Sequence, residues 1–206
     1  MRVTLDDHPC ASKAGSVGEA IAEAAVAAEQ RGRIVVEVIV DGRPWTDLHL
    51  GADPTDARDV SIVTADLRDL VRETLSDSSA ALAEADVMQR RAAELIQGNR
   101  GPAALAELTE AIGIWAAVRE AIVKASEAMS IDLDELRLGD DSIHQVLTRL
   151  TAQLRAVRSA LQADDPVGLS DTLLYDMPEV VGEWRELLEV LRSHVGDGSQ
   201  KEERES

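Results

Sequence analysis

The sequence predicts an α+β fold that is mostly helical. It divides into a small β-α-β-β(-β) module over residues 1–63, an antiparallel four-helix bundle over residues 64–195, and a disordered acidic and polar tail over residues 196–206. Two observations lead to this prediction. Apolar residues recur every three or four positions between positions 67 and 195, the spacing that places them on one face of a helix. Before them, a β-branched run at 33–40 is typical of a strand.

The N-terminal module begins with a short alternating strand at residues 2–5. A loop follows, because Asp6 and Asp7 favour a turn. Ser16 can then cap a helix that runs to about residue 31, and Gly32 ends it.

A hairpin is predicted after this helix. The strand at 33–40 is followed directly by Asp41-Gly42, a dipeptide suited to the positive φ angles of a tight turn. We expect residues 45–50 to return as the paired strand and residues 59–63 to add a short fourth strand. The apolar face of the preceding helix would cover this small sheet.

The bundle is predicted to begin at Thr64, which can cap a helix whose first turn contains Asp66. This helix ends at the turn 98–101, and Pro102 opens the next one at a position where its missing N–H is harmless. So short a turn predicts antiparallel neighbours. On the second helix of this pair, one stripe is predicted to face the core: Leu105, Leu108, Ile112, Trp115, Val118, Ile122, Ala125 and Met129.

Two further helices complete the predicted bundle. After a connection at 130–141, a helix covers residues 142–162, and its apolar stripe is Ile143, Val146, Leu147, Leu150, Leu154, Val157 and Leu161. Asp164-Asp165-Pro166 separates it from the last helix. Pro178 lies inside that helix and cannot donate a backbone hydrogen bond, so we expect a kink or break close to Met177.

Charge limits the classes of partner. The chain has 39 Asp and Glu against 21 Lys and Arg, a formal net charge of -18, which repels phosphate. Aromatic residues, on which bases stack, make up 2% of the chain. We therefore expect no nucleic-acid partner and instead a protein partner with basic character, with a homo-oligomer as an alternative.

The expected location is the cytoplasm. Cys10 is the single cysteine and cannot form an internal disulfide of the kind that marks secreted proteins. The sequence shows neither an apolar signal core nor the stretch of about 18 apolar residues that crosses a membrane. We expect no membrane partner.

No constellation for catalysis or metal binding stands out. The histidines, at His8, His49, His144 and His194, are scattered and have no metal-ligand spacing. Serine lacks a Gly-x-Ser-x-Gly elbow, and Cys10 follows His8 without a third orienting group. We expect no catalytic residue, no metal and no cofactor.

Four residues are candidates for partner binding: Tyr175, Met177, Trp184 and Trp45. The first three surround Pro178, where an opened helix would expose an adaptable apolar patch. The spacing of Trp184 also matches the leucines around it, which favours the core for that side chain. The strand at 34–40 is a second candidate, because a sheet edge can accept a partner strand, although pairing inside the module is favoured.

These patterns favour a non-catalytic cytoplasmic protein-binding adaptor, chaperone-like protein or assembly factor. In size, acidity and helix content the chain resembles the acidic chaperones of flagellar and other export systems, a likeness that includes no motif. One alternative is an enzyme whose site lies between the module and the bundle and uses Arg43, Asp47 and His49. Another is an acidic nucleic-acid mimic or antitoxin-like regulator.

Overall fold

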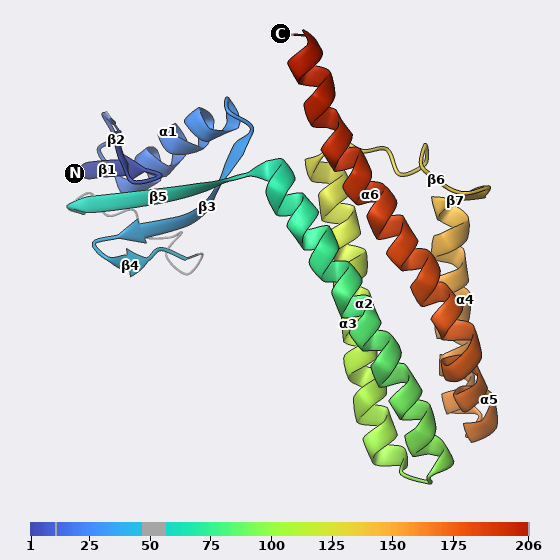
Figure 1. Cartoon of the computed structure of the whole chain (residues 1–206). Helices are drawn as coiled ribbons and strands as arrows, with labels where there is room; N and C mark the ends of the chain where they lie inside the picture. The colour runs from blue at the N-terminus through green and yellow to red at the C-terminus, as the bar shows by residue number, and fades with distance from the viewer. Residues whose placement is uncertain (11, 47–56, 206) are drawn as a thin grey trace. The chain divides into compact units, whose positions relative to one another are not determined.

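The computed structural model describes residues 1–10, 12–46 and 57–205, with side chains as far as residue 196. The chain divides into two compact units, Met1–Leu70 and Val71–Ser206, each of which is described by itself. The first contains a mixed β-sheet and one helix, and the second is almost entirely helical (Figure 1). The predicted fold class, α+β and mostly α, is confirmed.

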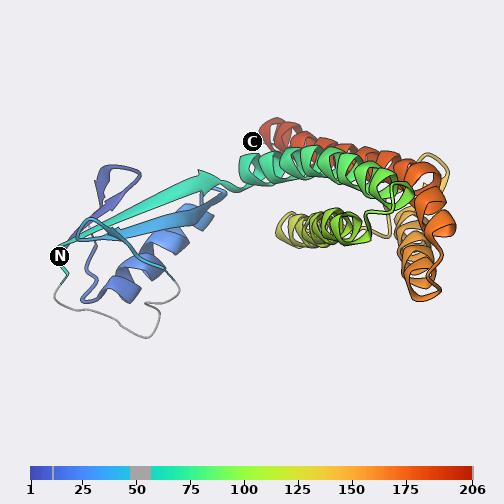
Figure 2. The ribbon, with the colours of Figure 1, turned by 90° about the horizontal axis from the view of Figure 1, so that it is seen from below.

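The first unit is a sheet covered on one face by a helix. Its described strands are β1 (Arg2–Leu5), β2 (His8–Cys10), β3 (Arg33–Val40), β4 (Arg43–Pro44) and β5 (Asp59–Asp66), in the order β2-β1-β5-β3-β4. The central strands β1 and β5 are parallel, and the other pairs are antiparallel. Helix α1 (Val17–Glu29) crosses one face (Figure 2) and buries small side chains at helical spacing against the sheet: Val17, Ala20, Ala24 and Ala28.

The predicted hairpin after β3 is present with a shorter return strand. Asp41 and Gly42 have φ angles of 48° and 78°, as a two-residue turn of this type requires. The described return strand is β4, and the N–H of Trp45 donates to the carbonyl of Val38 over 2.7 Å just beyond it. The rest of the predicted return, at 47–50, lies outside the described residues.

The sequence prediction missed a second hairpin. Residues 6–15 were predicted to be loop throughout, but β2 returns against β1 immediately after a two-residue turn. Asp6 and Asp7 form that turn with φ angles of 49° and 64°. Aspartate tolerates this left-handed region, but the pair lacks the glycine that makes a hairpin recognisable in sequence.

The prediction that Thr64 caps a helix is wrong. Thr64 is buried in β5, where its N–H and its hydroxyl each donate to the Asp6 carboxylate over 2.7 Å. Its hydroxyl oxygen also accepts a 2.7 Å hydrogen bond from Arg33, so the hydroxyl is engaged within the sheet rather than at a helix end. Asp66 caps α2 (Leu67–Gln97) instead, accepting from the N–H groups of residues 68 and 69.

The Asp6–Thr64 contact predicts an acid-sensitive first unit. The backbone hydrogen bond from Thr64, followed by its hydroxyl and the charge of Arg33, lowers the pKa of Asp6 below its ordinary value of 3.8. A lowered native pKa stabilises the fold above the unfolded value, and this stability is lost as pH falls through the native value.

We therefore expect Asp6→Asn to be less stable than the wild type at about pH 7, and the difference to shrink as pH falls below 3.8 and through the lowered native pKa of Asp6. Asparagine also tolerates the positive φ angle, so the turn is preserved. Amide hydrogen exchange of β1 and β5 in the full chain measures this difference. A difference that does not change with pH would contradict the assignment.

The described part of the second unit contains four long helices: α2, α3 (Gly101–Ala128), α4 (Ile143–Gln162) and α6 (Met177–Glu205). They lie in two layers, with α2 beside α6 and α3 with α4 (Figure 2). In the shared core the rings of Trp115 and Trp184 meet edge to face, with centroids 5.2 Å apart. The indole N–H of Trp115 donates to the buried Gln89 side chain over 3.0 Å, which ties α3 to α2.

Connections of this unit contain residues with positive φ angles. Asn99, with a φ angle of 55°, turns α2 into the antiparallel α3, as predicted. The connection at 130–141 was predicted as a loop, and it ends in a small hairpin of β6 (Arg137–Leu138) and β7 (Asp141–Ser142). Gly139 has a φ angle of 59° in its turn.

The irregularity expected near Met177 is present. After the short helix α5 (Pro166–Asp171), the chain forms one wide π-helical turn at Thr172–Asp176 and then enters α6. There the N–H of Met177 donates to the carbonyl of Thr172, five residues back. This wide turn adjoins Pro178, which has no N–H to donate.

Helix α6 continues to Glu205, past residue 196 where the sequence predicted a tail. Polar composition alone does not end a helix, because Lys, Glu and Arg at 201–205 are good helix formers.

Candidate functional site

Helix α3 presents two apolar faces rather than one. Its core face consists of Ala104, Leu108, Ala111, Trp115, Val118, Ile122 and Ala125. A second stripe at helical spacing is exposed along its whole length: Leu105, Thr109, Ile112, Ala116, Arg119 and Val123. Leu105 is 54% exposed and Ile112 41%, so their predicted place in the core is wrong.

Helix α4 carries a matching stripe. Positions at the same helical spacing are Leu147, Thr151, Leu154, Arg158 and Leu161. Leu161, which the sequence placed in the core, is 44% exposed. On α4, Leu161 is thus exposed, while Leu147 and Leu154 are half-buried.

The first hollow lies where α3 begins and α4 ends. It has a volume of about 380 Å³, and Leu105 and Leu161 contribute to its walls. Its lining is Ile96, Asn99, Gly101, Ala104, Leu105, Leu108, Ala160, Leu161, Asp164, Asp165, Pro166 and Leu169. Most of these side chains are apolar, and Asp164 and Asp165 lie at the end of the hollow where α4 stops.

A second hollow lies at the opposite ends of the same two helices. It measures about 240 Å³ and is lined by Arg119, Ile122, Val123, Leu133, Ile143, Leu147, Leu150, Thr151 and Trp184. Val123 is 41% exposed here. Arg119 adds the one charged side chain of this lining.

We use the name α3–α4 groove for the two hollows together with the stripes of α3 and α4 that run from one to the other. Val123 lies 18 positions after Leu105, so the α3 stripe is about 27 Å long at 1.5 Å per residue. Ile112 lies between these ends on the same stripe. The α3–α4 groove is thus long enough to receive about five turns of a helix.

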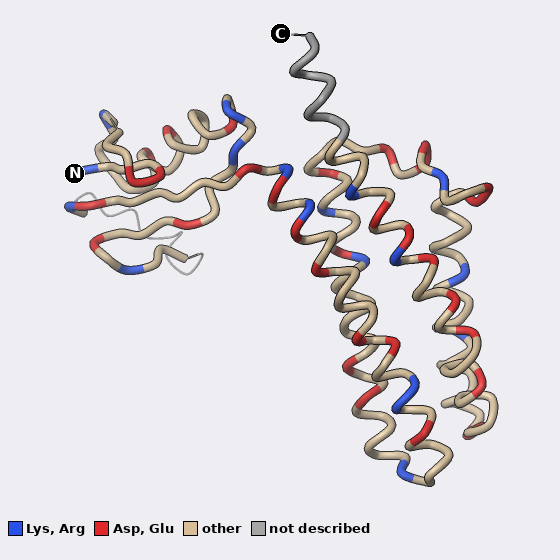
Figure 3. Tube along the Cα trace, in the orientation of Figure 1, with Lys and Arg blue, Asp and Glu red and all other residues tan. Residues whose placement is uncertain are grey.

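Two arginines belong to the groove in an otherwise acidic chain: Arg119 lines the second hollow, and Arg158 lies on the α4 stripe. Helix α4 contains three arginines and no Asp or Glu, whereas acidic residues are spread over α2 and α6 (Figure 3). Arg119 and Arg158 form no ion pair with any described residue. Glu120 flanks the stripe, but Lys124 pairs with it at 2.7 Å and its hydrogen bond lowers the pKa of Glu120.

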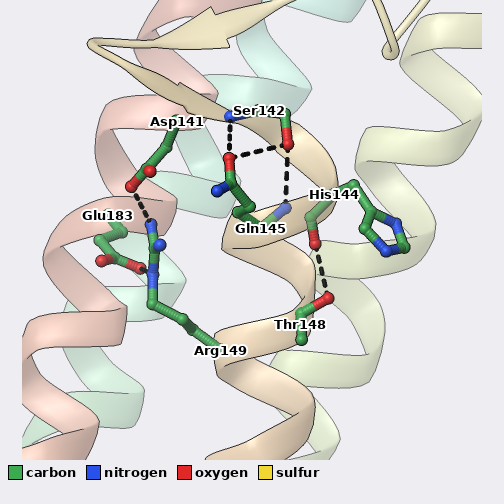
Figure 4. A network of polar contacts seen from close by, with 7 residues as sticks. All are labelled: Asp141, Ser142, His144, Gln145, Thr148, Arg149 and Glu183. Atoms are coloured by element: carbon green, nitrogen blue, oxygen red, sulfur yellow. Dashed lines mark hydrogen bonds and ion pairs between the residues drawn. The ribbon is translucent and has the colours of Figure 1, made fainter.

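A polar network holds the start of α4 in place (Figure 4). Ser142 and Gln145 form a reciprocal capping box, each side chain accepting from the backbone N–H of the other. One turn later, Arg149 bonds Asp141 and Glu183 at 2.8 Å each, and Glu183 belongs to α6. The hydrogen bond to Glu183 is the largest cause of the raised pKa of Arg149. This network orients α4, and with it one wall of the groove.

Of the four predicted partner-binding residues, Trp184 lines the second hollow of the groove, and the other three lie outside both hollows. Tyr175 is 68% exposed in the π-helical turn, while Met177 and Trp184 are buried in the core of the second unit. Trp45 is half-buried against the core of the first unit. At the predicted strand edge, 34–40, one side of β3 pairs with β5 along its length, and β4 pairs with the other side at Ile39 and Val40.

The alternative enzyme site is only partly described. Arg43 is exposed in β4, and Asp47 and His49 lie outside the described residues. Within the described ranges, no group of three or more His, Cys, Asp or Glu side chains could hold a metal ion. None of the described helices is both long and apolar enough to span a membrane.

Sequence reasoning missed the groove because it assigned all apolar residues of α3 to one core stripe. A signal was available: the apolar positions of α3 are spread around the helix, so one buried face cannot hold them all. Comparison of the chain with protein-family models, curated proteins and solved structures gives no match.

Proposed function

We propose that this protein is a non-catalytic, cytoplasmic protein-binding adaptor that receives a helix of a partner protein along the α3–α4 groove. The observation that supports this proposal is the exposed apolar stripe of α3, flanked at both ends by apolar hollows shared with α4. Contiguous exposed apolar surface marks an interaction site more often than scattered single residues do.

The shape of the groove favours a helix over an extended peptide. A helix in a groove binds through apolar anchors repeated every three or four residues, and both stripes of the groove have this repeat. Partner strands instead add to sheet edges through backbone hydrogen bonds. Helices α3 and α4 have no free backbone of that kind along the groove.

The test places a photo-crosslinking amino acid at single positions of the full chain inside cells. We expect crosslinks to one partner from the positions of Leu105 and Leu161, and none from Val87, which is 64% exposed on α2 outside the groove. Crosslinks of equal yield at Val87, or no crosslink at either groove position, would refute the proposal.

Affinity for the crosslinked partner gives the second readout. Leu105→Asp combined with Leu161→Asp should weaken binding by at least ~30-fold, the loss typical of removing hot-spot side chains. Val87→Asp is the matched control and should bind as the wild type does. Helical circular dichroism verifies that each variant is folded.

A further inference from the structure

We infer that the partner helix is acidic between its apolar anchors, and that Arg119 and Arg158 select it. This inference rests on the proposed function and adds the chemistry of the partner. The net charge of -18 favours a basic partner instead. The local charge of the contacted surface, however, determines which partner is complementary, rather than the net charge of the whole chain.

Charge complementarity is the first argument. Arg119 and Arg158 lie in the two stripes of the groove, and neither has an ion-pair partner within the described ranges. The stripes contain no Asp or Glu from Leu105 to Val123 or from Leu147 to Leu161. A docked carboxylate would gain a charge-assisted hydrogen bond from a guanidinium that has no ion-pair partner among the described residues.

Position along the groove is the second argument. Arg119 lies 14 residues, about 21 Å, from Leu105 on α3, and Arg158 lies three residues, about 4.5 Å, from Leu161 on α4. Since Leu105 and Leu161 line the same hollow, the two arginines differ in position by about 16 Å when counted along the helices, the length of three helical turns. They also project from opposite walls, so the matching carboxylates lie on opposite flanks of the partner helix.

The acidic end of the groove restricts the partner further. Asp164 and Asp165 lie beyond Leu161 in the first hollow, where they repel a carboxylate placed outside the anchors. The carboxylates of the partner are therefore expected between the two anchors, three turns apart. This pattern therefore predicts the orientation of the partner helix along the groove as well as its charge.

The experiment uses three synthetic amphipathic helical peptides as probes. All have leucine anchors spaced to reach both hollows, and the two positions that face Arg119 and Arg158 are Glu, Gln or Lys. Fluorescence anisotropy with the full chain measures their affinities. We expect the Glu peptide to bind about tenfold more tightly than the Gln peptide, and the Lys peptide to bind most weakly.

Charge-reversed variants show whether the two arginines cause this order. Arg119→Glu combined with Arg158→Glu should reverse the preference, so that the Lys peptide binds best. Arg185→Glu is the control, because Arg185 is exposed on α6 and bonds Ser79 of α2, in the other layer. It should leave the order of the three peptides unchanged.

The outcomes separate this inference from the proposed function. One outcome is that all three peptides bind the wild type equally and that the variant with both Leu105→Asp and Leu161→Asp binds none of them. The groove is then a docking site, and the inference of an acidic partner is wrong. Absence of Glu-peptide binding also overturns the acidic partner, while the crosslinking test decides the proposed function. If the chain forms a dimer that the same leucine variant dissociates, the occupant is a second copy and the inference is wrong.

Discussion

Replacing Trp115 with alanine is expected to destabilise the second unit by ~3–5 kcal/mol, the usual range for emptying a buried aromatic site. Trp115 is 2% exposed and packs edge to face on Trp184, so the substitution removes an aromatic contact together with buried area. It also leaves the Gln89 carbonyl oxygen without its donor in the core.

Chemical denaturation followed by circular dichroism measures this loss. Val87→Ala serves as the comparison, since Val87 is exposed on α2 and surface changes usually remain within ~0.5 kcal/mol. The loss of unfolding free energy in Trp115→Phe should lie between those of Trp115→Ala and Val87→Ala, because phenylalanine keeps an aromatic ring but cannot form the hydrogen bond to Gln89. A loss below ~1 kcal/mol for Trp115→Ala would show that the ring does not support the core.

Replacing Ile62 with alanine should destabilise the first unit by ~2–5 kcal/mol. Ile62 is fully buried in β5, the strand between β1 and β3, and it is paired in register with Leu5 on one side and Val38 on the other. Loss of its side chain leaves a cavity under α1. Alanine also forms strands less readily than a β-branched residue.

Amide hydrogen exchange in the full chain gives the local readout for this variant. Protection of β1, β3 and β5 amides should fall together, since the core of this unit is shared by all three strands. Val36→Ala is the matched control, because Val36 is a β-branched residue of β3 that is 47% exposed. Equal effects of the two substitutions would contradict the assignment of Ile62 to the core.

Local sequence signals predicted most elements of the fold. Ser16 caps α1 and Asp41-Gly42 turns β3 into β4, both as expected. Helix α4 covers the predicted range, with Ser142 as its N-cap. Each of these signals acts within a few residues of the feature that it specifies. The start of α2 depends instead on Asp6, which is 58 positions before Thr64 in the chain and occupies its hydroxyl. A contact between residues so far apart is invisible to a local pattern.

The candidate groove could not be located from the sequence for a related reason. Leu105 and Leu108 are both apolar and both fit a helical repeat, yet Leu108 is 4% exposed and Leu105 is 54% exposed. Which of the two faces the core depends on the rotation of α3 about its own axis, and that rotation is fixed by neighbours such as Gln89 and Trp184. Periodicity predicts that a helix has an apolar face but does not show whether a given residue of it faces the core or solvent.

The exposed stripe of α3 has a consequence for the isolated protein at high concentration. Its leucine and isoleucine side chains adhere to similar surfaces, while the excess of 39 acidic over 21 basic residues keeps neighbouring molecules apart in dilute buffer. At about 1 M salt the screening length shrinks to roughly 3 Å. The electrostatic repulsion between molecules is then lost, and apolar attraction between their exposed stripes favours association. Association between folded molecules, and not unfolding, therefore limits the salt concentration at which this protein remains monodisperse.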